Sequence, residues 1–114
     1  MVEEFLVHAI RFEFPPKWVG SASGVPTAWT ARPLAGLLAG SRSDAVVWPS
    51  HSGARKGRGL EPIHRAMPGY KLTNPLVYEW ATVVDALRIG GARDRAVAQE
   101  ALGRMIDSGL EAAA

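Results

Sequence analysis

The 114-residue sequence predicts a small α+β protein, in which a mostly antiparallel sheet of about four strands is packed with helices. Three observations favour this class. Short apolar runs come first in the chain, turn-forming Gly and Pro clusters separate them, and two amphipathic segments of helical period come last. We therefore expect one domain, residues 1–114, with a strand-rich part over residues 1–72 and a C-terminal αα-hairpin over residues 73–109.

The N-terminal third predicts two strands joined by a loop. In residues 4–14, Leu6, Ile10, Phe12 and Phe14 share one face of a period of two, with His8 among them, and aromatic and β-branched residues are frequent, which is typical of a strand. Pro15 would end this strand, because proline cannot donate to a β-ladder. Residues 15–27 are rich in Pro, Gly and Ser and predict a loop, and residues 27–31 predict a short strand.

The middle of the chain predicts short elements around a cationic loop. Residues 30–40 favour a short helix, with Leu34, Leu37 and Leu38 toward the core, and residues 45–48 favour a strand. Residues 49–71 form the predicted basic loop, whose glycines argue against a stable helix or strand. Within and after it, residues 60–64 predict an edge strand and residues 70–72 one more strand.

The last part of the chain predicts two helices. Thr73 or Asn74 can cap the first of them, and Pro75 suits its first turn. Gly90-Gly91 would end it, and a second helix follows over residues 92–108. The apolar stripe of the first helix, which we expect to face the core, consists of Leu76, Trp80, Val83, Val84 and Leu87.

The positive charge of the chain is concentrated in its middle. The net charge is only +2, but residues 32–71 carry seven Lys or Arg and two Asp or Glu. The segments before and after this one are mildly acidic. A basic centre suggests a polyanionic partner, whereas a merely solvated surface is the alternative explanation.

Three tryptophans in the first half of the chain, Trp18, Trp29 and Trp48, lie near cations in the sequence. Aromatic rings next to cations are the combination that binding of a single-stranded nucleic acid needs. Cations hold phosphates, and aromatic faces stack on unpaired bases. We therefore predict a non-enzymatic protein that binds single-stranded DNA or RNA in a basic, aromatic-lined cleft. The candidate binding residues are Lys17, Trp18, Trp29, Arg32, Trp48, Arg55, Lys56, Arg58, Arg65, Tyr70 and Lys71, although Trp48 could instead belong to the core.

Two other functions are open on the sequence. The C-terminal helices could join copies of the chain, which would make it a homo-oligomeric assembly protein or let it multiply its contacts with one strand. A metal-independent ribonuclease could use His51 and His64 in general acid–base chemistry, while His8 is expected in the core. Cysteine is absent, and the spacing of histidines and acids predicts no metal site. The spacing of the glycines predicts no nucleotide cofactor.

The composition also indicates where the protein works. Acids follow the initial methionine, and no apolar run has the length of a membrane helix, so we expect a cytoplasmic protein without a membrane partner. Asn74 is the only asparagine and Gln99 the only glutamine, which is typical of thermophiles, although a GC-rich genome gives a similar bias.

In its layout the chain resembles the ThermoDBP-related single-stranded DNA-binding proteins of archaea. The shared points are the Phe14-Pro15-Pro16-Lys17-Trp18 segment, the basic middle, the helical end and the thermophile-like composition. The resemblance implies a basic, aromatic-lined cleft followed by helices used in oligomerisation. It assigns no individual functional residue.

Overall fold

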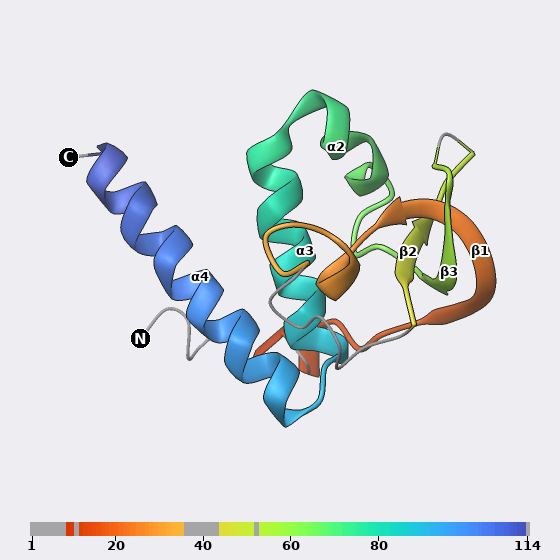
Figure 1. The fold of residues 1–114 in the computed structure, drawn as a ribbon, viewed down its shortest axis with the longest axis horizontal. Helices are drawn as coiled ribbons and strands as arrows, with labels where there is room; N and C mark the ends of the chain where they lie inside the picture. The colour runs from red at the N-terminus through yellow and green to blue at the C-terminus, as the bar shows by residue number, and fades with distance from the viewer. Residues whose placement is uncertain (1–8, 11, 36–43, 52, 114) are drawn as a thin grey trace.

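The computed structural model describes residues 9, 10, 12–35, 44–51 and 53–113. Three strands lie together at one side of the molecule and the long helices at the other, with α3 between the strands and α4 (Figure 1). The elements are β1 (Trp18–Pro26), η1 (Ala28–Thr30), β2 (Val46–Pro49), β3 (Arg55–Leu60), η2 (Met67–Gly69), α2 (Tyr70–Thr73), α3 (Pro75–Ile89) and α4 (Ala92–Ala113).

The three strands close into a small barrel. β1 is the longest strand, and it pairs antiparallel with β2 along one edge and with β3 along the other. β2 and β3 pair in parallel, which completes the closure. The predicted α+β class is confirmed, but the sheet of the described residues has three strands instead of four and is mixed in direction.

Glycine makes this narrow barrel sterically possible. A Cβ atom on Gly24 would lie 1.8 Å from the carbonyl oxygen of Trp48, and one on Gly57 would lie 2.7 Å from that of Ala45. Backbones of neighbouring strands therefore approach each other through positions that have no room for a side chain. The same residue type that argues against a strand in an ordinary sheet is required here.

Two predicted loops are therefore strands. Residues 18–26, within the predicted loop 15–27, form β1, and the glycine-rich centre of the predicted basic loop 49–71 forms β3. The predicted edge strand 60–64 is wrong, because β3 ends at Leu60 and turns follow. The expectation rested on the entropic cost of ordering glycine, which the close packing of the barrel outweighs.

Three short predictions are also wrong. The described residues 9, 10, 12 and 13, in the predicted strand 4–14, are helical. In this helical segment Ile10 packs in the core, while Phe12, two residues on, is exposed. Residues 28–30 form the 3₁₀ helix η1 instead of a strand, and residues 70–73 form α2, since the Pro68-Gly69 turn leads directly into helix.

The other predicted elements agree better with the structure. β2 confirms the strand at residues 45–48, and α3 and α4 confirm the C-terminal helical pair. The side chain of Asn74 caps α3 by accepting a hydrogen bond of 3.3 Å from the amide of Val77. Of the helix predicted over residues 30–40, residues 32–35 form a turn and the rest lies outside the described residues, as do Leu37 and Leu38.

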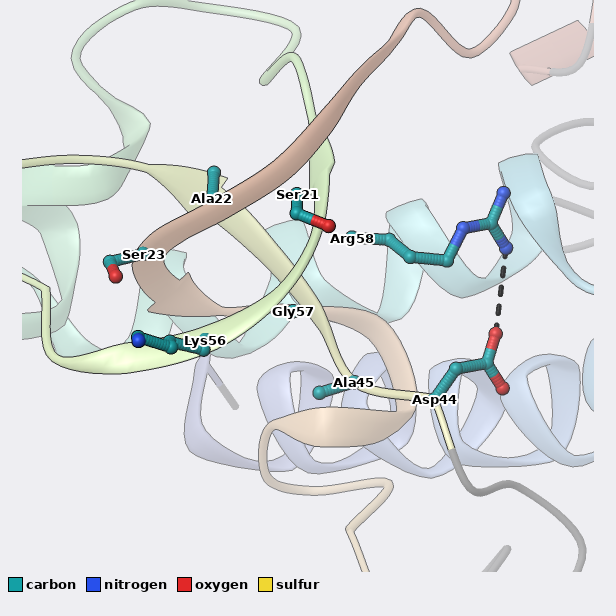
Figure 2. Close-up of a pocket in the computed structure, with 8 residues that line it drawn as sticks. All are labelled: Ser21, Ala22, Ser23, Asp44, Ala45, Lys56, Gly57 and Arg58. Carbon is teal, nitrogen blue, oxygen red and sulfur yellow. Dashed lines mark hydrogen bonds and ion pairs between the residues drawn. The ribbon is translucent and has the colours of Figure 1, made fainter.

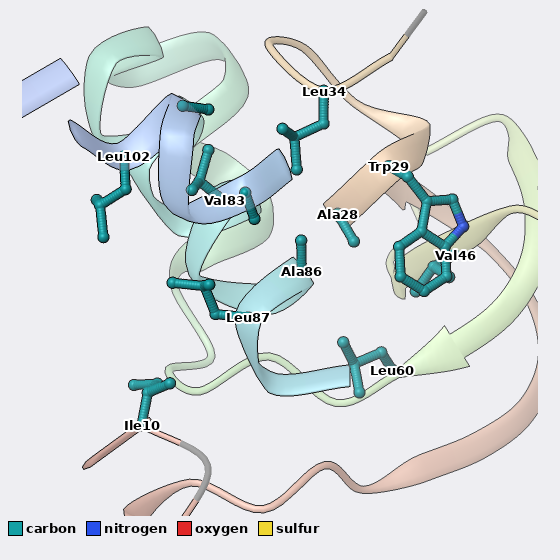
Figure 3. Close-up of a cluster of buried hydrophobic side chains, with 12 residues drawn as sticks. Ile10, Ala28, Trp29, Leu34, Val46, Leu60, Val83, Ala86, Leu87 and Leu102 are labelled. Atoms are coloured by element: carbon teal, nitrogen blue, oxygen red, sulfur yellow. The ribbon is translucent and has the colours of Figure 1, made fainter. Parts of the chain in front are cut away.

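The main hydrophobic core lies between α3, α4 and the barrel (Figure 3). Val83 and Leu87 of the predicted stripe are fully buried in it, together with Leu34. Leu76 of the same stripe is 64% exposed, because it lies on the side of α3 that faces α4, where the two helices diverge (Figure 1). A second, smaller cluster contains Trp48 and joins the barrel to α2 and α3.

A buried polar network ties α3 to the barrel. The carboxylate of Asp85 is fully buried and accepts hydrogen bonds from Thr27 Oγ1 at 2.7 Å, Trp48 Nε1 at 2.6 Å and a terminal nitrogen of Arg88 at 2.7 Å. Arg88 also donates to the carbonyl oxygens of Phe14 and Pro15. Burial raises the pKa of Asp85, while these hydrogen bonds and the charge of Arg88 oppose the rise.

Candidate functional site

The exposed face of the β1–β3 pair presents hydroxyl groups opposite cations. Ser21 pairs with Arg58, and Ser23 pairs with Lys56, so each hydroxyl lies on the same face as the cation across from it. These four residues line an open groove of about 690 Å³. A groove with hydroxyls along one strand and cations along the other offers both neutral and charged donors to an anion with several oxygens.

Arg58 is the most connected cation of this groove. Its guanidinium lies 4.0 Å above the ring centroid of Trp18, which is 38% exposed. It also forms an ion pair of 3.5 Å with Asp44, while the side chain of Lys56 extends the other way along the groove (Figure 2). Both partners of the ion pair are about half exposed, so it contributes little to stability and can open at low cost.

Arg55 faces a different part of the surface. It is the neighbour of Lys56 on β3, and adjacent residues of a strand point to opposite faces. With Lys71 it lines a second hollow, of about 530 Å³, between the end of β1, the segment before β3 and α2. The predicted cations of β3 are therefore divided between two surfaces.

Two of the predicted stacking rings lie in the protein interior. Trp48 is fully buried, contacts Tyr78 edge to face at 5.8 Å between centroids, and donates to Asp85. Trp29 is 8% exposed and donates from Nε1 to the carbonyl oxygen of Asp44 at 3.0 Å. Neither ring has a free face for a base, so the expectation that they stack is not met in this conformation.

The remaining predicted residues lie around these surfaces without forming one continuous cleft. Lys17 borders a small separate hollow beside Glu61. Arg32 and Arg65 are exposed and line neither the groove nor the hollow described above. Tyr70 is half-buried and packs against the cluster around Trp48.

Sequence reasoning missed Ser21, Ser23 and Asp44. A signal for the serines exists, since S-A-S between two glycines has the period of a strand, but it is visible only once β1 is recognised. Asp44 precedes β2, and only the fold brings it to Arg58. The buried carboxylate of Asp85 had no sequence signal beyond an acid within an apolar helix face.

The structure gives no support to acid–base catalysis by histidine. The Nδ1 atom of His64 accepts a hydrogen bond from the amide of Ala66 at 3.1 Å, which is a turn-stabilising contact. His51 precedes β3 in the sequence, whereas His64 follows it. His51 is exposed, and neither histidine lines the groove. His8 lies outside the described residues. Within the described part of the chain, no group of three His, Cys, Asp or Glu side chains is arranged to hold a metal ion.

Comparisons with known proteins give no further assignment. The chain matches no protein-family model, no curated protein and no solved structure. The resemblance to ThermoDBP-related proteins therefore stays a prediction. Among the helices of the described residues, none is long and apolar enough to span a membrane.

Proposed function

We propose that this protein binds single-stranded nucleic acid along the groove of the β1–β3 pair, without catalysis. The observation that carries the proposal is the ladder of Ser21, Ser23, Lys56 and Arg58 on one exposed face of two paired strands. Phosphates repeat along a nucleic-acid backbone, and a row of donors from two strands suits such a repeat.

The groove supports sequence-independent binding. Its described lining contains no Asn or Gln side chain, which are the usual readers of adenine edges. Its cations, Lys56 and Arg58, by contrast, suit phosphate oxygens. Binding should therefore depend strongly on salt and weakly on base sequence.

Stacking is proposed for one position only. Trp18 and the guanidinium above it form a two-layer platform at the end of the groove, and planar guanidinium groups stack on bases much as aromatic rings do. One stacked base contributes about 1–3 kcal/mol, less than the four rings expected from the sequence would have supplied. Phosphate contacts then provide most of the affinity.

The first test removes the two cations of the groove. In Lys56→Ala with Arg58→Ala, we expect affinity for a labelled oligo-dT of about 12 nucleotides to fall on the order of tenfold or more, for all base compositions alike. The slope of log affinity against log salt should become shallower by about 1.4, because two phosphate contacts are lost. Fluorescence anisotropy between about 50 and 200 mM salt measures both quantities.

The matched control removes two exposed cations from α4, Arg93→Ala with Arg104→Ala, which lowers the net charge equally at the far side of α3. Its affinity should change little. Asp44→Asn should raise the affinity a few-fold, because it removes an anion that competes with phosphate for Arg58. Equal losses in the groove variant and the α4 control would reduce the effect to net charge and contradict the proposal.

A second candidate function is assembly through the helical pair. An apolar groove of about 580 Å³ lies between α3 and α4, lined by Leu76, Trp80 and Met105 among others. The two helices diverge toward the C-terminus, so this part of α4 does not cover α3 (Figure 1). Exposed apolar surface of this kind is typical of an interaction site.

Light scattering coupled to size-exclusion chromatography tests this candidate. Assembly predicts a mass above the 12.2 kDa of one chain and a return to that mass in Leu76→Arg. A protein that stays monomeric at high concentration excludes it, whereas an oligomer without affinity for oligo-dT would favour it over nucleic-acid binding.

A further inference from the structure

The hollow on the other face of β3 combines two cations with an apolar lining. Arg55 and Lys71 contribute the charge, and the described residues that line it include no acid. The apolar part comes from Val25, Pro26, Ala54, Pro68 and Leu72. Its volume of about 530 Å³ lies within the range of small-molecule sites.

Leu72 is the part of this apolar surface that does not belong to the core. The ring of Tyr70, at the start of α2, packs inward against the cluster around Trp48. Leu72, two residues later, is turned outward and is 87% exposed. It covers no other described side chain of the core, so its apolar surface at the edge of a cationic hollow is available to a ligand.

The chemistry of the hollow selects an anion with a flat apolar body. Two cations without a neighbouring acid favour a phosphate, which can accept from both. Proline rings and a leucine side chain offer an apolar face but no hydrogen-bonding side chain that could read a base edge. A nucleotide of any base has both parts, a phosphate and a planar ring.

We propose that this hollow binds one nucleotide of a single strand, with its phosphate between Arg55 and Lys71 and its base against Leu72 and the prolines. The inference rests on the proposed function, of which it is an extension. Arg55 and Lys56 are adjacent on β3, so a strand that leaves the groove at Lys56 reaches the hollow by passing around the start of β3.

This geometry predicts a dependence on strand length. An oligonucleotide of two or three residues occupies one surface, whereas a longer one occupies both, and the second contact is then intramolecular. In the wild-type protein affinity should rise steeply once the strand spans groove and hollow. Arg55→Ala with Lys71→Ala should retain the affinity for the shortest strands and lose on the order of tenfold for oligo-dT of about 12 nucleotides.

Leu72→Ala separates the base contact from the phosphate contacts. Affinity for the longer strand should fall about fivefold, while the salt slope should not change because no charge is removed. Phe12→Ala is the control, since Phe12 is also an exposed apolar side chain but lines neither the hollow, the groove nor the α3–α4 surface. Both side chains are exposed, so neither change should affect folding, which thermal melting would verify.

The outcomes are distinguishable from failure of the proposed function. Loss of binding in the Lys56/Arg58 variant together with unchanged binding in the Arg55/Lys71 and Leu72 variants overturns the inference and leaves the groove intact. Absence of binding at every strand length in the wild-type protein overturns both. Equal effects of Leu72→Ala and Phe12→Ala would also contradict a base contact in the hollow.

Discussion

Replacing Asp85 with asparagine is expected to reduce the free energy of unfolding by about 3–5 kcal/mol. Arg88 is 3% exposed at its side chain, so its charge would be left in the interior without a compensating carboxylate. The asparagine NH₂ group would also replace one of the two acceptor oxygens, so it would face either the donors of Thr27 and Trp48 or that of Arg88, which an amide nitrogen cannot satisfy. Urea denaturation followed by tryptophan fluorescence measures the loss.

A second Arg–carboxylate pair in the same protein is the control. Arg104 and Glu100 on α4 pair at 3.1 Å, but both are exposed. Glu100→Gln should change stability by less than about 1 kcal/mol, because solvent screens exposed pairs. Similar effects of the two substitutions would mean that Asp85 is not enclosed as described.

The same carboxylate predicts a pH dependence with a definite sign. Burial raises the pKa of Asp85 above its ordinary value of 3.8, so the folded protein keeps this proton to a higher pH than the unfolded chain does. Over that window the folded state binds more protons, and this contribution to stability is present below about 3.8 and is lost as the pH rises through the raised pKa. Asp85→Asn should abolish this part of the pH profile.

The helical half of the fold was predictable because its signals are local. Asn74 and Pro75 mark the start of α3, and the buried Val83 and Leu87 follow at helical spacing. Such signals depend on residues three or four apart in sequence and hold wherever the helix packs. The order of strands before helices also gave the α+β class correctly.

The barrel was not predictable because its cause is non-local. Particular positions of β1 and β3 are glycine because opposing backbones leave no space there, as where Gly24 meets Trp48 and Gly57 meets Ala45. Taken one segment at a time, they have the composition of loops. For the candidate site, the sequence identifies the cations of β3. Their division between two faces follows from β3 being a strand, whereas the sequence predicts a loop there.

The tryptophans show the same limit. Trp18 is partly exposed, and the cation over its ring is Arg58 of β3 and not its sequence neighbour Lys17. Trp48 lies next to a basic segment in sequence, yet it packs against Tyr78 of α3 and donates to a carboxylate of the same helix. Proximity along the chain does not distinguish these two directions, because successive strand residues point to opposite faces.

Gly24→Ala is expected to destabilise the protein by about 3 kcal/mol or more. The added Cβ would lie 1.8 Å from the carbonyl oxygen and 2.6 Å from the carbonyl carbon of Trp48. Both are backbone atoms of β2, so relief requires β1 and β2 to separate where Val25 pairs with Trp48. That separation would also expose the indole, which shifts its fluorescence to longer wavelength before global unfolding.

Gly103→Ala is the matched substitution in the helical half. Gly103 lies within α4, and a Cβ on it would have no neighbour within 4 Å. Alanine there should raise stability by about 0.5–1 kcal/mol, because glycine loses more backbone entropy in a helix. The two glycine substitutions thus have opposite expected signs in the same denaturation assay, and a mild effect of Gly24→Ala would show that β1 does not approach β2 closely enough to close the barrel.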